Sequence, residues 1–447
     1  MPPRGTFGTA DTPRVATLAD LPATAADGMR VNVTKRRSIY EYDATAAAWT
    51  RTTDCDPAWA RSADVYVNYS TGSDDADGTL SAPLATVTEA VARLGDNTVN
   101  SSGIFWIHMT GNATETKWDL RAFTTVTQPI VITGEPTVLL STTVTAVAWN
   151  AASNTRGTIT GASSIAAYAA SSATTNGSLF RVVGGARDGM YGTLQLHTGG
   201  GAVQYDLVSY WWTPGGAQLQ TGDTIEILSA PAMPPNLLVR RGTVVFLACL
   251  SGLTGGLHAG TIEPATEGWF SSCSLRGDLD SGGGWLSIIG CTMAGHAARV
   301  ESGAGYLEID SGRVYGVAVR SSGEGHLSNC TVEERIVANE GGRLFHENGH
   351  VWLAHSTSGS TIELHPGARW WATATCVAGS GVICGTGLAG GTAGMMRLHE
   401  DAIYRGPVPV CTGTGTQINL NGTAKNFSDA ASYVAVSGAA IGPRSAT

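Results

Sequence analysis

The chain has 447 residues, of which 43% are hydrophobic and 14% charged, and its formal net charge is −9. Its length exceeds one ordinary domain, so we expect two to four modules. The low net charge argues against a disordered chain, and the mild acidity argues against a nucleic-acid partner, which would require a basic patch. The 58 glycines, spread among short Ser, Thr and Ala runs, are typical of an all-β protein with many tight turns.

The start of the chain and its cysteines predict where the protein is made. Residues 1–14 lack the apolar core of a signal peptide, and no run of 18 apolar residues predicts a membrane span. We therefore expect a protein that is assembled in a cytoplasm and does not insert into a membrane. Eight cysteines in a long chain without a secretion signal favour free thiols over a disulfide framework.

Residues 1–60 are predicted to form a separate N-terminal β module. Short strands are expected within 29–34, 38–43 and 48–51, because apolar and polar residues alternate there as on a half-buried strand. So small a sheet is marginally stable alone, and we expect it to rest on a partner or on neighbouring copies.

Residues 61–135 are predicted to begin a parallel β-helix and to carry its capping helix. A strand at 64–68 is followed by a polar turn at 73–78. Residues 83–95 then place apolar side chains at helical spacing, with Pro83 near the start and Gly95 as the stop. Strand-like runs follow at 104–108 and 130–133.

Two further regions are predicted outside the repeating coils. Residues 136–235 predict an inserted all-β domain, with strand candidates at 179–183, 192–196 and 223–228. Residues 391–447 lose the repeating pattern and predict a C-terminal cap or trimerisation region, which a solenoid needs because its last coil exposes open backbone edges.

Residues 236–390 carry the strongest signal, a repeat of about twenty residues with Gly-rich corners. Such a period indicates a solenoid in which each coil buries its apolar face on the next. Coils rise about 4.8 Å each, so some seven of them would make a rod of roughly 35 Å. Successive strands are predicted to open at Trp269, Trp285, Tyr306, His326, Arg343, Thr361 and Val382.

Four cysteines fit this repeat. Cys249, Cys273, Cys291 and Cys330 are separated by 24, 18 and 39 residues, and the last interval is two coils with Ser311 or Gly312 between them. One recurring coil position predicts an interior ladder of small side chains. A zinc site is the alternative, but zinc ligands usually come in close pairs such as Cys-x-x-Cys. We expect structural thiols and no metal or other cofactor.

The opening of the coil region resembles that of pectate-lyase-like β-helix proteins. The resemblance rests on Tyr66–Asn68, Thr71–Gly78, Pro83 and Thr86–Ala90. It implies a right-handed parallel β-helix and is specific for fold rather than for activity.

Other segments resemble bacteriophage tail proteins. Ala16–Pro22 and Ser38–Trp49 are similar to segments near the start of phage fibres, and Gly157–Gly161 with Gly222–Ile227 resembles β modules of phage tails. The resemblance implies a virion protein, a tail spike or tail fibre. It would form a homotrimer, contact other tail or baseplate proteins through its N-terminal module, and attach to host surface polysaccharide. A polysaccharide depolymerase and a purely structural baseplate or head-fibre component are the alternatives.

A hydrolase would need two carboxylates that flank the sugar bond. Glu308 and Asp310 are two residues apart on a predicted strand, so both should point outward. Glu347, and Glu363 with His365, are predicted to fall near the same column on neighbouring coils. An ordinary polar outer face is the favoured interpretation of these residues.

A lyase would need a base, which in this architecture is often Lys or Arg. No Lys occurs from 118 to 424, which excludes a Lys base in the coils. Arginines remain, and we expect each to lie in a solvated turn or in an ion pair between coils: Arg240, Arg276, Arg299, Arg313, Arg320, Arg335 and Arg343.

Two other groups could bind ligands. The adjacent pairs Trp211/Trp212 and Trp370/Trp371 should each expose one ring. The exposed ring could contact carbohydrate, form a trimer interface or pack against a loop, and the last two are favoured.

The Asp74, Asp75 and Asp77 cluster could bind Ca²⁺, but it lacks the distal Glu of an EF-hand loop, and a capped turn next to the helix is favoured.

Overall fold

The structure is a computed structural model. It describes residues 13–16, 18–33, 38–55, 64–94, 104–121, 129–149, 156–161, 163–171, 177–199, 201–207, 218–247, 250–252, 260–264, 266–300, 305–320, 322–328, 330–338 and 342–346, and the backbone of the strands between 351 and 441.

Three separate sheets make up the described chain: an N-terminal sheet of four strands, a sheet of seven strands, and a long sheet of 29 strands. Helix is scarce in the described residues, where the longest is α1 (Val87–Leu94). The predicted all-β class and parallel β-solenoid are therefore confirmed. None of the helices in the described part is long and apolar enough to span a membrane.

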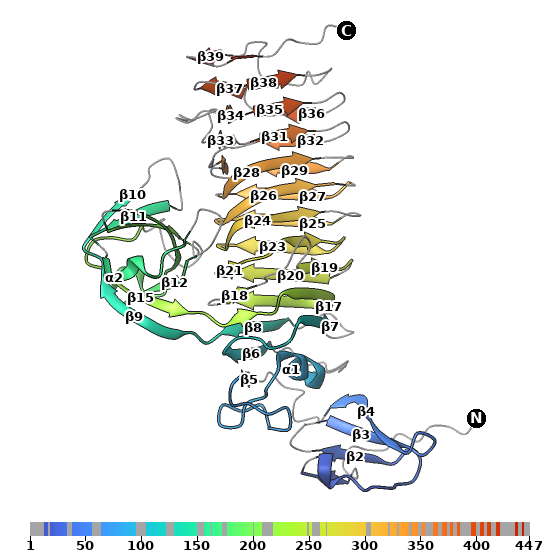
Figure 1. The fold of residues 1–447 in the computed structure, drawn as a ribbon. Helices are drawn as coiled ribbons and strands as arrows, with labels where there is room; N and C mark the ends of the chain where they lie inside the picture. The colour runs from blue at the N-terminus through green and yellow to red at the C-terminus, as the bar shows by residue number, and fades with distance from the viewer. Residues whose placement is uncertain are drawn as a thin grey trace.

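The solenoid stacks its coils along one axis (Figure 1). We call its most regular face sheet I. Eleven parallel strands form sheet I in order: β5 (Asp64–Asn68), β6 (Phe105–Thr110), β8 (Ile130–Gly134), the second half of β17 (Asn236–Leu247), β20 (Thr266–Ser271), β23 (Trp285–Ile289), β25 (Tyr306–Asp310), β27 (Glu324–Ser328), β29 (Arg343–His346), β32 (Arg369–Ala372) and β36 (Ile403–Arg405).

A second parallel sheet, sheet II, forms another face of the solenoid. Its parallel strands are β7 (Lys117–Arg121), the first half of β17, β19 (Gly260–Ile262), β22 (Leu279–Ser281), β24 (Thr292–Val300), β26 (Arg313–Val319), β28 (Thr331–Ala338), β31 (Thr361–Leu364), β35 (Met395–Leu398), β38 (Gln417–Leu420) and β40 (Ala440–Ile441).

Short strands join the two faces at one corner. They are β16 (Ala232–Met233), β18 (Ser251–Gly252), β21 (Ser274–Leu275), the starts of β24, β26 and β28, and then β30 (Val351–Leu353) and β33 (Cys376–Ala378). Near the end of the chain β34 (Val382–Cys384) pairs antiparallel with β33 and with β37 (Pro409–Thr412), which β39 (Val434–Val436) follows.

Alternation along each strand builds the solenoid core. In β25, Leu307 and Ile309 are fully buried while the residues between and beside them are half-exposed. Identical inward positions stack from coil to coil; the rings of Phe246 and Phe270 lie 4.5 Å apart and nearly parallel, at 11°. Each coil therefore buries its apolar face only against its neighbours, as a solenoid requires.

The predicted cysteine ladder is confirmed for its described members. Cys273, Cys291 and Cys330 are buried free thiols, and strand register aligns Cys273 with Cys291 and places Gly312 before Cys330. Cys249 lies outside the described residues. The position below Cys273 belongs to Leu250, which is also buried.

The predicted strand starts at Trp285, Tyr306, Arg343, Thr361 and Val382 are confirmed. The last two do not continue sheet I, however, because Thr361 opens β31 in sheet II and Val382 opens the antiparallel β34. The two faces share one alternating pattern, so sequence cannot tell which face a strand belongs to. Paired residues on sheet I are 24, 18, 21, 18, 19, 26 and 34 residues apart, in the sequence positions 243, 267, 285, 306, 324, 343, 369 and 403.

The solenoid is longer than predicted at its C-terminal end. It has eleven coils on sheet I, about 48 Å of rise at about 4.8 Å per coil. Seven of them, from β17 to β32, lie within 236–390, as predicted; three precede them in 61–135 and one, β36, follows residue 390. The described strands after residue 390 continue the parallel pairing through β38 and β40. The prediction that the coil pattern ends at 390 was therefore wrong for these strands.

The predicted capping helix is present as α1, at the N-terminal end of the stack. Its apolar face, with Val87, Ala90 and Val91, joins the solenoid core. The Asp74 carboxylate accepts hydrogen bonds from the Ala85 and Thr86 N–H groups, both at 3.0 Å. The favoured interpretation of the acidic cluster as a capped turn beside the helix is thus confirmed for Asp74.

The N-terminal sheet has the predicted strands. They are β2 (Arg30–Val33), β3 (Ser38–Asp43) and β4 (Ala48–Cys55), joined antiparallel, with β1 (Arg14–Val15) parallel to β2. Val31, Val33, Tyr40 and Tyr42 are buried, as the alternation predicts.

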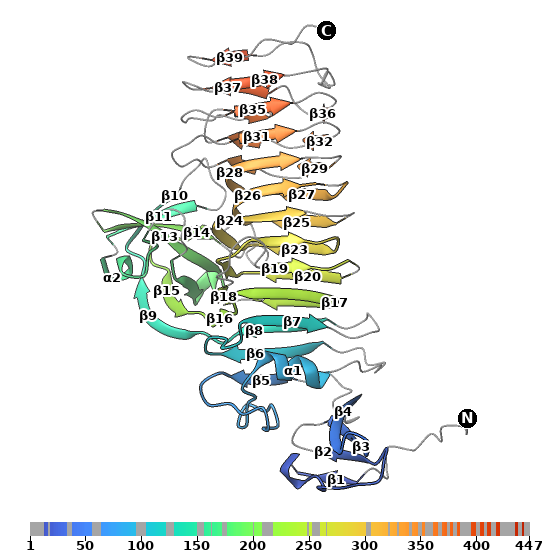
Figure 2. The ribbon, with the colours of Figure 1, turned by 45° about the vertical axis from the view of Figure 1, so that its right-hand side comes forward.

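The seven-stranded sheet leaves the solenoid after β8 and returns at β16, and it lies beside the coils (Figures 1 and 2). It is antiparallel and has its own core, over which the short helix α2 (Ser163–Ala166) packs. Its strand order is β10 (Ala146–Trp149), β11 (Arg156–Thr160), β14 (Ala202–Leu207), β13 (Tyr191–Gly199), β12 (Leu179–Val183), β15 (Thr224–Ser229) and β9 (Thr137–Thr143).

A buried ion pair joins this sheet to the solenoid. Arg313 of β26 donates to Asp206 of β14 at 3.0 Å and to Gln195 of β13 at 2.6 Å. The side chains of Arg313 and Asp206 are only 6% and 2% exposed. Thr292 adds a buried contact to Thr193 at 3.3 Å. The expected environment of Arg313, a solvated turn or a pair between coils, was therefore wrong.

Candidate functional site

The outer face of sheet I presents three columns of side chains, each running along the solenoid axis. Strand register defines them. The first column is Thr243, Glu267, Trp285, Tyr306, Glu324 and Arg343; the second is Val245, Trp269, Ser287, Glu308, His326 and Phe345; the third is Leu247, Ser271, Ile289, Asp310 and Ser328.

Five rings from the first two columns form a continuous stack, which we call the aromatic ladder: Trp269, Trp285, Tyr306, His326 and Phe345. Successive ring centroids are 6.1, 4.5, 4.8 and 4.6 Å apart. Trp285 is 38% exposed, and it is the one aromatic residue among the exposed large apolar side chains in the described part of the chain. The other four rings are half-buried, so a partly exposed aromatic strip crosses five coils.

Carboxylates line the aromatic ladder. Glu308 lies in the same strand as Tyr306 and accepts a hydrogen bond from the Ser287 hydroxyl at 2.8 Å. Glu324 lies 2.7 Å from Nε2 of His326 and 3.8 Å from the Arg343 guanidinium.

Two further carboxylates complete this set. Glu267 accepts a hydrogen bond from Thr243 at 3.1 Å, and Asp310 accepts one from Ser311 at 3.0 Å. Each carboxylate is thus fixed by a neighbouring donor, and the face combines apolar rings with anchored hydrogen-bond acceptors.

The structure brings together only part of the predicted carboxylate set. Glu308 and Asp310 do lie on one outward face. Glu363 does not share their column, because β31 pairs it with Val337 on sheet II. Glu347 and His365 lie outside the described residues.

The tryptophan pairs are less fully described. Trp211 and Trp212 lie outside the described residues. For Trp370 and Trp371 the backbone is described, and register places Trp371 next after Phe345, in the column of Glu308.

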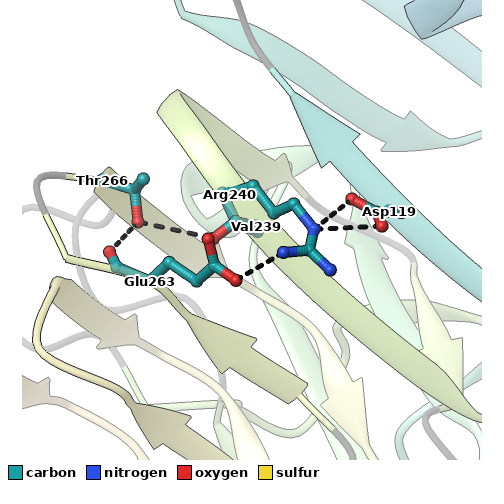
Figure 3. A network of polar contacts seen from close by, with 5 residues as sticks. All are labelled: Asp119, Val239, Arg240, Glu263 and Thr266. Carbon is teal, nitrogen blue, oxygen red and sulfur yellow. Dashed lines mark hydrogen bonds and ion pairs between the residues drawn. The ribbon is translucent and has the colours of Figure 1, made fainter.

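Arg240 forms the predicted ion pair between coils. It donates to Asp119 of β7 at 2.8 Å and to Glu263, beyond β19, at 2.8 Å (Figure 3). The Thr266 hydroxyl donates to the backbone carbonyl of Glu263 and so holds the same corner (Figure 3). Arg240 therefore links three coils through two ion pairs. An arginine paired with two carboxylates does not suit the role of a lyase base.

A second charged cluster lies at the start of β22. Asp278 accepts hydrogen bonds from the Ala297 N–H at 2.9 Å and from Arg299 at 2.8 Å, with Nδ1 of His296 at 3.5 Å. Burial raises the pKa of Asp278, but the hydrogen bonds from His296 and Ala297 and the charge of Arg299 outweigh it and hold this pKa below its usual value.

Sequence reasoning missed the aromatic ladder as a site. Trp269, Trp285, Tyr306 and His326 attract attention as markers of successive coils, and their aromatic character is the signal that could have identified them. Sequence spacing alone does not show that they touch, because contact depends on the register between coils.

Comparisons with known proteins do not assign a family. No family model and no curated protein matches the chain. Among solved structures, a glycoside hydrolase is similar at 10% sequence identity with a TM-score of 0.32, covering 86% of this chain and 98% of its own.

Proposed function

We propose that this chain binds a polysaccharide of a host cell surface along the outer face of sheet I, as a homotrimeric tail spike or tail fibre of a bacteriophage. One observation carries the binding proposal: the aromatic ladder is exposed at Trp285 and lined by anchored carboxylates. Ligand sites combine apolar rings with a few placed polar groups. Sugars present C–H surfaces and hydroxyl donors, which fit this combination.

The phage context is supported by the resemblance of the N-terminal segments and of the 157–161 and 222–227 segments to phage tail proteins. The N-terminal sheet, at the other end from the C-terminal coils (Figure 1), would then attach to the particle.

A depolymerase is the second candidate, and the positions of the carboxylates favour it over a lyase. Glu308 and Asp310 are two residues apart on β25, so their Cα atoms are about 6.6 Å apart, and Glu308 and Glu324 lie diagonally on adjacent coils at roughly 8 Å. Glycosidases use two carboxylates that flank the scissile bond, and either pair would supply both from one face of the solenoid.

Purified protein incubated with envelope polysaccharide from a susceptible host tests both candidates, by retention of polysaccharide and by release of reducing ends. Trp285→Ala is expected to weaken binding at least tenfold, about 1.4 kcal/mol. Leu139→Ala, which removes an exposed apolar side chain on β9 of the seven-stranded sheet, is the matched control and should bind normally.

The outcomes separate the candidates. Binding without new reducing ends supports an adhesin, whereas release that Glu308→Gln abolishes supports a depolymerase. Equal binding by wild type and Trp285→Ala would overturn the assignment to the aromatic ladder. If the protein shows neither binding nor release, both candidates are wrong and a structural virion component is the function that remains.

A further inference from the structure

We infer that the polysaccharide bound on sheet I is neutral or carries amino groups, and that the face rejects chains rich in carboxylate or sulfate. This inference rests on the proposed binding function and specifies its substrate class. It is drawn from the distribution of charge along the aromatic ladder.

Four carboxylates lie on this face within four successive coils, from β20 to β27. At about 4.8 Å per coil they fall within roughly 15 Å of each other along the axis. They are Glu267, Glu308, Asp310 and Glu324.

Arginine and lysine in the described columns are confined to one end of the ladder, where Arg343 lies 3.8 Å from Glu324. The same carboxylate lies 2.7 Å from Nε2 of His326. Hydroxyl groups donate to two of the other carboxylates, Thr243 to Glu267 and Ser287 to Glu308. A hydroxyl partner fixes a carboxylate without neutralising it, so Glu267 and Glu308 keep their negative charge.

This arrangement discriminates by charge. A sugar hydroxyl or ammonium group that lies on the ladder donates to an anchored carboxylate, and such charge-assisted hydrogen bonds are the strong ones. A uronic acid or sulfate group in the same place would be repelled by the carboxylates at short range, which disfavours binding of acidic chains. The rings contribute contact area that is insensitive to the charge of the chain.

An array of bacterial surface polysaccharides that includes neutral, free-amine and uronic-acid chains tests the inference, with binding measured at low and at high salt. The bound members should be neutral or amine-bearing. Amine-bearing chains should lose affinity as salt is raised, because salt screens charge pairs, whereas neutral chains should not.

Two variants assign the selectivity to the named residues. Glu308→Gln should weaken binding of amine-bearing chains at least fivefold more than it weakens binding of neutral chains, because only the ammonium group loses a full charge pair. Trp285→Ala should weaken every bound chain. Glu41→Gln, which removes an exposed carboxylate on β3 of the N-terminal sheet, is the control and should change neither.

Failure of the inference is distinguishable from failure of the proposed function. If the tightest member is a uronic-acid chain whose binding Trp285→Ala abolishes, the charge inference is wrong and polysaccharide binding on the ladder stands. If no chain on the array binds, or if binding survives Trp285→Ala unchanged, the binding function assigned to sheet I is overturned and the inference falls with it.

Discussion

The buried ion pair between the seven-stranded sheet and the solenoid gives the sharpest prediction about stability. Arg313→Ala would remove the guanidinium that donates to the Asp206 carboxylate at 3.0 Å, and the side chain of Asp206 is only 2% exposed. Breaking a buried pair by removing one partner costs about 3–5 kcal/mol, because the remaining charge stays buried. The pair joins residues 107 apart in sequence, so the loss should be concentrated where the two sheets meet.

Hydrogen exchange measured by mass spectrometry locates that loss. Amides of β13 and β14 in Arg313→Ala should exchange at least about 100-fold faster than in wild type, since about 1.4 kcal/mol is a factor of ten. Arg240→Ala is the matched control. Its partners are more than a third exposed, and such pairs contribute about 0.2–1 kcal/mol.

A second variant separates charge burial from packing. Arg313→Met combined with Asp206→Leu removes both charges, and replacing a buried pair by apolar residues is often neutral or stabilising. Exchange in this double variant should return toward the wild-type rate. If Arg313→Ala accelerates exchange no more than Arg240→Ala does, the reasoning from the buried pair is refuted.

Three further predictions concern the solenoid. The pKa of Asp278 is lowered on folding from 3.8, so its charged form stabilises the fold above that pH; thermal unfolding should show Asp278→Asn less stable near about pH 7, with the difference lost as pH falls through the folded-state value. Burial, followed by the nearby charge of Asp310, raises the pKa of Cys330 to about 12; mass spectrometry should therefore show no alkylation of this thiol at about pH 8 until the chain is denatured. Phe270 is fully buried and stacked on Phe246, so Phe270→Ala should lower the free energy of unfolding by about 3–5 kcal/mol in a denaturant titration, and Phe270→Leu by less.

The repeating architecture could be predicted from sequence because its physical causes are local. Alternation of buried and exposed side chains, corners rich in glycine, and cysteines at one coil position all appear as short-range patterns, and the ladder of Cys273, Cys291 and Cys330 was found where the spacing placed it. The capping helix could also be predicted, from Pro83 and from the helical spacing of the apolar residues that follow it.

The face to which each strand belongs could not be predicted, because the connections between strands vary in length. The coil that follows Arg343 takes 26 residues and the next takes 34, so a period near twenty loses register. Glu363 was consequently placed in the wrong column. Arg313 was misjudged for a different reason: its partner Asp206 belongs to a sheet whose docking on the solenoid leaves no local sequence signal.

The geometry of the aromatic ladder separates the rings that stabilise neighbouring coils from the ring that the proposed function assigns to a ligand. Rings that stack nearly parallel cover one another's faces, as His326 and Phe345 do at 19°, and such contacts stabilise neighbouring coils. The stack changes direction at Trp285, which lies at 20° to Trp269 and at 52° to Tyr306. A tilted, exposed ring presents apolar surface that its neighbours do not cover. Under the proposed function, ligand contact on this face should therefore depend more on Trp285 than on Tyr306, His326 and Phe345.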